Sequence, residues 1–200
     1  MVVIWKELFD ELLWLRLKWQ NYKVLYSNPA NVEVLNESAG TFFGICQLVF
    51  FDDAITALCR ITDPETSCGR PNISLKRLLA EVDQSAHGKL FCDADKLLSS
   101  IEVRMVLLRH HRNKRISHND YYTAVNPSVN PIPGISRQNI SELLDEIHDF
   151  LELFDIEFNQ SITAKTVACP FDGADKLLRY LQKACELRKK DNYKFIMDAD

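Results

Sequence analysis

The stretch ESAGTFFGICQLVFFDDAITALCRI, residues 37–61, decides the fold class, because it is apolar on most sides of a helix. A helix that is apolar all round lies at the centre of a domain. Thr62, Asp63 and Pro64 follow it and are expected to end it, since proline cannot continue a helix. We therefore predict a central helix here and interpret the chain outward from it.

The segments on both sides also have helical spacing. We expect a helix over residues 3–26 that ends at Asn28–Pro29, a short helix near 74–83, and a long helix capped by Asp93 that runs to about residue 115. Ser136 begins a helix that reaches Phe154. Asp172 or Gly173 opens a last one, which becomes basic over residues 188–190, as the helix dipole favours.

No segment alternates apolar and polar residues between hairpin turns, so the fold class is all-α, an antiparallel helical bundle. The whole chain, residues 1–200, is expected to form a single domain. A long loop with three prolines separates two of the helices, over about residues 118–135. A loop of this length is often functional.

The composition excludes several function classes. The chain has 200 residues, 46% of them hydrophobic and 26% charged, which is typical of a soluble globular protein. A net charge of −4 excludes a basic nucleic-acid coat, so any nucleic-acid role needs a local patch. The longest apolar stretch, residues 41–51, is shorter than the roughly 20 residues of a membrane span. We therefore expect no membrane partner. The first residues carry Glu7, Asp10 and Glu11 and do not resemble a signal peptide, and no C-x-x-C pair occurs, so we expect a cytoplasmic protein with reduced thiols.

The basic stretch RMVLLRHHRNKRISH, residues 104–118, is the most informative part of the chain. It holds five Arg or Lys and three His and no acid, so the rest of the chain carries about −9, by −4 − 5. Such a patch is typical of phosphate binding. The same cations are also favoured at any helix C-terminus, so both interpretations stay open.

Helical geometry singles out Arg112 within this stretch. It continues the centre of an apolar stripe formed by Leu98, Ile101, Met105 and Leu108. Its side chain either points to a cleft, a subunit seam or a carboxylate, or extends into solvent past the end of the core. His118 lies six residues later, so the helix must end or bend for both to meet one substrate. Ser117, Asn119 and Asp120 favour such a turn.

The segment RNKRISHND, residues 112–120, resembles the signature of the HEPN superfamily, which is an arginine, a polar residue, a few more residues and a histidine. The stretch CRITDPETSCGRPNISLKRLL, residues 59–79, is similar to the abortive-infection (AbiU-type) branch. The resemblance covers about residues 37–155, with extra N- and C-terminal helices outside it.

The resemblance implies a metal-independent endoribonuclease in phage defence, or a toxin, that forms a homodimer. Arg112 would hold the phosphate, and Asn113 would orient either the phosphate or the histidine. His118 would move protons for attack by the ribose 2′-OH. The expected partners are RNA and an antitoxin or regulator, with no metal and no cofactor. The predicted RNA-binding residues are Arg109, Lys114 and Arg115 from the basic patch, and Tyr121, whose ring could stack on a base.

Other interpretations stay open. The same patch would serve a non-catalytic module that binds RNA, a nucleotide or a partner, and a purely structural helical protein is a third class. Tyr121 and Tyr122 either stack on bases or pack at the surface. One of His110 and His111 could act as a second base. His87 and His148 are interpreted as incidental, and the chain has no H-x-x-x-H or H-E-x-x-H metal pattern.

Overall fold

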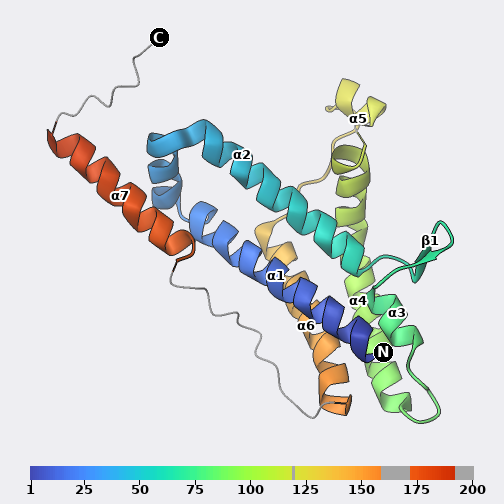
Figure 1. The fold of residues 1–200 in the computed structure, drawn as a ribbon. Coiled ribbons are helices and arrows are strands. Elements are labelled where there is room, and N and C mark those ends of the chain that lie inside the picture. The colour runs from blue at the N-terminus through green and yellow to red at the C-terminus, as the bar shows by residue number, and fades with distance from the viewer. Residues whose placement is uncertain (119, 159–171, 192–200) are drawn as a thin grey trace. The chain divides into compact units, whose positions relative to one another are not determined.

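The computed structural model describes residues 1–118, 120–158 and 172–191. Of these residues, 78% are helical, and the only β-structure among them is one two-stranded sheet, so the all-α prediction is confirmed. The described residues divide into two compact units: residues 1–16 with 52–158, and residues 17–51 with 172–191. Helices α1 (Val2–Tyr26) and α2 (Pro29–Ile61) contribute to both units (Figure 1).

The first unit is built around two antiparallel helices, α4 (Gly88–His111) and α6 (Arg137–Phe158) (Figure 1). Ion pairs fix their direction. Arg104, late in α4, contacts Glu142 at 2.5 Å and Glu146 at 2.9 Å near the start of α6. His87, just before α4, contacts Glu157 at the end of α6 at 2.7 Å. The predicted apolar stripe of α4 is buried, at Leu98, Ile101, Met105 and Leu108.

The first half of α1 packs along α6 through polar contacts at the edge of the core. The indole Nε1 of Trp5 donates to the carbonyl oxygen of Leu151 at 2.9 Å. The Arg16 guanidinium donates to the Leu144 carbonyl at 2.7 Å and to the Asp145 carboxylate at 2.8 Å. Because carbonyls inside a helix accept these bonds, α1 is fixed in register against α6.

Two predicted helix starts are confirmed by their caps. The α3 helix (Leu75–Ala80) begins after Ser74, whose hydroxyl accepts a hydrogen bond from the Arg77 amide at 3.3 Å. The Ser136 hydroxyl accepts from the Asn139 amide at 3.0 Å at the start of α6. Both contacts are typical of an N-cap.

Three local predictions in the first unit are wrong. Asp93 does not cap α4, because the helix begins five residues earlier, at Gly88. The loop after residue 118 contains a short helix, α5 (Tyr121–Val125). The segment after Pro64, where no hairpin was predicted, contains a hairpin of β1 (Thr66–Ser67) and β2 (Arg70–Pro71). Its turn is allowed because Cys68 and Gly69 adopt φ values of 50° and 73°, which glycine tolerates best.

The second unit contains the end of α1, the first part of α2 and the helix α7 (Ala174–Asp191). The α2 helix begins at Pro29, earlier than the predicted residue 37, because proline is well placed in a first helical turn. A kink at Ala39 (φ −160°, ψ 67°) divides it near the predicted start. At the predicted opening of the last helix, the Ala174 amide donates to the Asn21 side chain at 2.8 Å.

One face of α2 in the second unit is apolar and exposed. Phe42, Ile45, Leu48 and Val49 are between 57% and 61% exposed. By length and composition alone, α2 could cross a membrane, with a mean hydropathy of 1.6 over its most apolar window. Central helices of soluble proteins satisfy the same test, so the expected absence of a membrane partner stays a prediction.

Candidate functional site

The basic stretch lies where α4 changes its geometry and ends. After His111 the chain forms a π-helical turn, η1 (Arg112–Ile116), in which the Ser117 amide donates to the Arg112 carbonyl five residues earlier, at 2.8 Å. The chain then leaves the helix before His118. The condition set by the sequence, that the helix end or bend between Arg112 and His118, is therefore met. Single π-turns in α-helices often occur at functional sites.

The turn after His118 is fixed by Asp120. Its amide donates to the Lys114 carbonyl at 3.1 Å, and its carboxylate accepts from the Thr123 amide at 3.1 Å, as the N-cap of α5. The Lys114 ammonium contacts the same carboxylate at 2.7 Å. The hydrogen bonds from Lys114 and Thr123 lower the pKa of Asp120 to about 2, so this carboxylate is ionised at neutral pH.

Arg112 points to a carboxylate, which is one of the alternatives left open by the sequence. Its Nη1 lies 3.4 Å from an oxygen of Asp63, which follows α2. Its Nε donates to the side-chain oxygen of Asn113 at 3.1 Å. The side chains of Arg112 and Asp63 are only 26% and 28% exposed, so this pair is better shielded than a surface ion pair.

Arg109 is held even more tightly. Its guanidinium donates to both oxygens of Glu102 at 2.8 Å, and to the carbonyl and hydroxyl oxygens of Thr62 at 2.8 and 3.1 Å. Burial raises the pKa of Glu102, but the hydrogen bonds and charges of Arg109 and Lys76 outweigh it and hold that pKa below its ordinary value. RNA binding by Arg109 stays a prediction, since these contacts join α4 to the end of α2.

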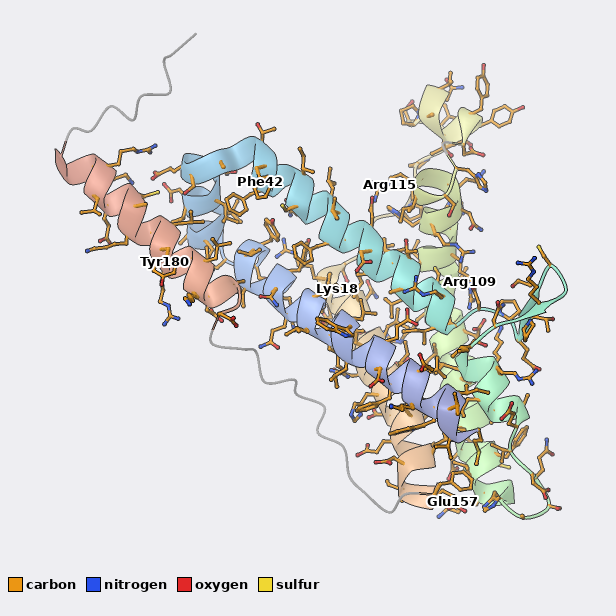
Figure 2. All side chains as sticks on the ribbon, in the orientation of Figure 1. Lys18, Phe42, Arg109, Arg115, Glu157 and Tyr180 are labelled. Atoms are coloured by element: carbon orange, nitrogen blue, oxygen red, sulfur yellow. The ribbon has the colours of Figure 1, made fainter. Side chains whose placement is uncertain are left out.

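Every cation of the basic stretch has an acidic partner in the described part of the chain. Besides the contacts already given, the Arg115 guanidinium pairs with Asp52 of α2. Figure 2 labels Arg109 and Arg115, which lie on the side of their helix toward α2. The charge excess of residues 104–118 is therefore compensated in three dimensions. Sequence counting missed this, because Asp52, Asp63 and Glu142 lie far away in the chain.

Of the predicted site residues, His118 and Tyr121 face solvent, as do Asn113 and Arg115. His118 is exposed, and the described residues show no hydrogen bond between it and Arg112. Tyr121 is 68% exposed and meets Tyr122 edge to face, with ring centroids 5.5 Å apart. Both side chains are therefore accessible to a ligand.

The two adjacent histidines differ in environment, as their helical separation predicts. His110 is exposed, whereas His111 is half-buried, and its Nδ1 has no hydrogen-bond partner among the described residues. Burial, followed by the nearby Arg115 charge, lowers the pKa of His111 below its ordinary value. His111 is therefore neutral at physiological pH.

Thr62 and Asp63 are the residues near the site that the sequence analysis treated only as a helix end. Cys59, one turn earlier, is fully buried beside them. Burial raises the pKa of its thiol to about 11, and the opposing charges of Arg112 and Arg109 do not offset this. Cys59 is therefore protonated at neutral pH and unsuited to act as a nucleophile.

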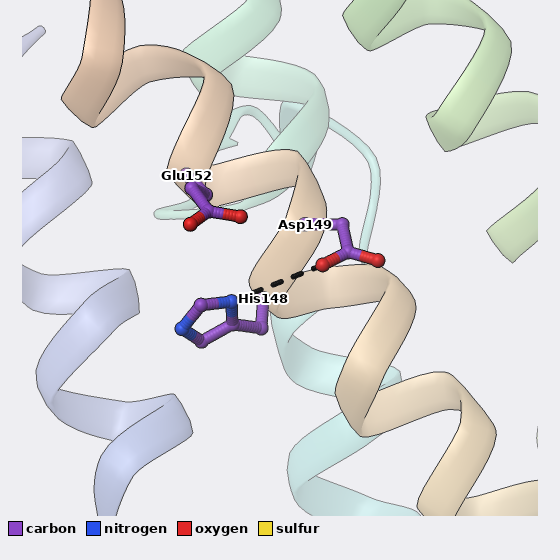
Figure 3. Close-up of side chains that lie close together, drawn as sticks. All are labelled: His148, Asp149 and Glu152. Atoms are coloured by element: carbon purple, nitrogen blue, oxygen red, sulfur yellow. Dashed lines mark ion pairs between the residues drawn. The ribbon is translucent and has the colours of Figure 1, made fainter. Parts of the chain in front are cut away.

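One group of described side chains could hold a metal ion. His148, Asp149 and Glu152 of α6 each offer a ligand atom, and these atoms lie within 4.8 Å of one another (Figure 3). The imidazole is buried, and its Nδ1 lies 4.0 Å from the Asp149 carboxylate. An imidazole with two carboxylates suits a divalent transition metal. The sequence pattern indicates an incidental histidine at position 148, whereas the structure places its ring close to two carboxylates.

An all-α bundle with an arginine, a polar residue and a histidine at the end of a long helix is the architecture of a HEPN-like domain. The family model described as AbiU2 (HEPN_AbiU2) matches residues 3–175, so the chain belongs to this abortive-infection family. The match is longer than the 37–155 expected from the sequence and includes α1. Comparisons with curated proteins and with solved structures gave no match.

Proposed function

We propose that this HEPN-like module of abortive infection is a metal-independent endoribonuclease. The observation that carries the proposal is the placement of Arg112, Asn113 and His118 around a π-turn at the end of a long helix. Arg112 is shielded and oriented, whereas His118 is exposed. These are the environments that a phosphate-holding cation and a proton-transferring group require.

The proposed reaction uses the ribose 2′-OH of RNA as the nucleophile. A neutral imidazole takes the 2′ proton, O2′ bonds to phosphorus, and the bond from phosphorus to O5′ breaks. An imidazolium protonates the departing O5′, which gives a 2′,3′-cyclic phosphate and a 5′-hydroxyl. Arg112 stabilises the charge on the phosphate oxygens. Asn113 keeps its amide N–H groups for the phosphate, since its oxygen accepts from Arg112.

The reaction needs one group to remove a proton and one to supply it. We propose a homodimer in which His118 of each copy serves one shared cleft. We further propose that the protein acts in the cytoplasm, in phage defence or as a toxin, under control of an antitoxin or regulator.

The test is an RNA cleavage assay in EDTA with the full chain. Wild-type protein should produce 2′,3′-cyclic phosphate ends. His118→Ala should slow cleavage at least about 100-fold, with RNA affinity within about two-fold. His87→Gln is the matched control, because His87 lies at the opposite end of α4, and it should cleave normally. Cleavage that requires an added metal, or that survives His118→Ala, would contradict the proposal.

A non-catalytic binding module is the second candidate, and the ion pairing of the basic stretch favours a protein partner over an RNA backbone as its ligand. Because Arg104, Arg109, Lys114 and Arg115 all contact acids, little uncompensated charge is left for an RNA backbone. Under this candidate, a panel of RNAs would show no cleavage. Arg112→Ala would then change only the affinity for RNA, a nucleotide or a partner.

A further inference from the structure

The end of α2 is a rigid support for the last turn of α4. Thr62 is fully buried, and its hydroxyl donates to the Leu58 carbonyl at 2.9 Å. Its own carbonyl accepts from Arg109 at 2.8 Å. Pro64 follows directly, which restricts the backbone of Asp63. Because Thr62 before it is hydrogen-bonded and Pro64 after it restricts the backbone, Asp63 holds its carboxylate in a defined position beside Arg112.

The contacts of Arg112 leave part of its guanidinium available. A guanidinium carries five N–H donors in a planar fork. In Arg112, one on Nη1 faces Asp63 at 3.4 Å, and the one on Nε faces Asn113 at 3.1 Å. Both contacts constrain the plane of the fork, and neither uses Nη2. The remaining donors can bind a phosphate while the fork stays oriented.

We propose that Asp63 is a positioning residue of the active site, which orients the Arg112 guanidinium for the phosphate. This inference rests on the proposed ribonuclease function. Asp63 acts through Arg112 and does not contact RNA itself. It also places a negative charge beside the phosphate-binding cation, so it weakens the attraction for RNA while it improves the alignment of the bound phosphate.

The two effects of Asp63 have opposite signs, and this gives the test. Asp63→Asn removes the charge but keeps the size of the side chain. We expect RNA to bind about two- to five-fold more tightly at low salt. We expect kcat to fall about 10-fold, because the fork is no longer fixed. Asp63→Glu keeps the charge and should recover most of kcat.

Two matched controls separate charge from position. Asp52→Asn removes a different acidic partner of the basic stretch, the one that pairs with Arg115, and should tighten RNA binding to a similar extent. Asp145→Asn removes an acidic partner of Arg16, in a contact between α1 and α6, and should change neither affinity nor kcat. In an Arg112→Ala background, Asp63→Asn should cause no further fall in kcat, because it has no guanidinium left to orient.

The outcomes are distinct. A rise in both affinity and kcat in Asp63→Asn would overturn the inference, because Asp63 would then merely compete with the phosphate. An equal fall in kcat with and without Arg112 would overturn it in favour of a structural role. If His118→Ala abolishes cleavage but Asp63→Asn cleaves normally, only this inference fails. If the wild-type chain does not cleave RNA, both the proposed function and this inference fail.

Discussion

Replacement of Arg109 by alanine tests whether this residue is mainly a structural brace. In the folded chain its guanidinium makes two 2.8 Å hydrogen bonds to Glu102 and two further bonds, at 2.8 and 3.1 Å, to Thr62. The side chains of Arg109 and Glu102 are 24% and 28% exposed, so solvent screens them only in part. Arg109→Ala removes all four bonds at once.

The expected loss of stability follows from these contacts. Hydrogen bonds to charged groups each contribute about 1.5–3 kcal/mol, but bonds that share one guanidinium do not add. Glu102 also keeps the ammonium of Lys76 at 3.3 Å, so its charge is not left unpaired. We therefore expect a loss of about 2–3 kcal/mol. For a chain of this size, that corresponds to a fall in Tm of about 5–10 °C.

The measurement is thermal and urea unfolding of the full chain, followed by circular dichroism. Arg115→Ala is the matched control, since Arg115 is 36% exposed and makes one ion pair with Asp52. It should cost less than about 1 kcal/mol. A loss for Arg109→Ala no larger than that of the control would refute the reasoning. Its guanidinium would then be free enough to serve mainly as a contact for RNA.

Two further predictions concern titration and can be measured by NMR. The Asp120 carboxyl should titrate near pH 2, below its ordinary value of 3.8. Its cap on α5 is therefore complete above about pH 4 and is lost as the pH falls through 2. Lys114→Ala should raise the pKa of Asp120. His111 should titrate below its ordinary value of 6.5. The stability that its neutral imidazole contributes is complete above that pH and is lost on acidification. Arg115→Gln should raise the pKa of His111, and an unchanged pKa would contradict the electrostatic cause.

Much of the helical fold could be predicted, because it depends on local patterns. Apolar spacing located the buried stripe of α4, and Ser74 and Ser136 marked the starts of α3 and α6. The helix starts that were predicted wrongly are those where more than one residue could act as a cap. Asp93 is a good cap residue, but here it lies inside a helix that begins at Gly88. Tertiary packing of α4 on α6 outweighs that preference.

The candidate site could be predicted only as a list of residues. The stripe geometry showed that Arg112 was unusual, and the turn-forming residues indicated a break before His118. The partners of the cations could not be found in this way. Asp63 was recognised only as a helix end, and Asp52 lies in a segment that was interpreted as core. Contacts between residues about 50 positions apart depend on how helices pack, and sequence spacing does not encode that.

The wide turn at Arg112–Ile116 also bears on how related chains are aligned. A π-turn accommodates one more residue than the α-helical turn that it replaces. Two chains whose arginine and histidine differ by one residue in separation could therefore present these groups in the same way, if one has the wide turn and the other a regular one. Homologous positions in this region are better matched by backbone geometry than by counting residues.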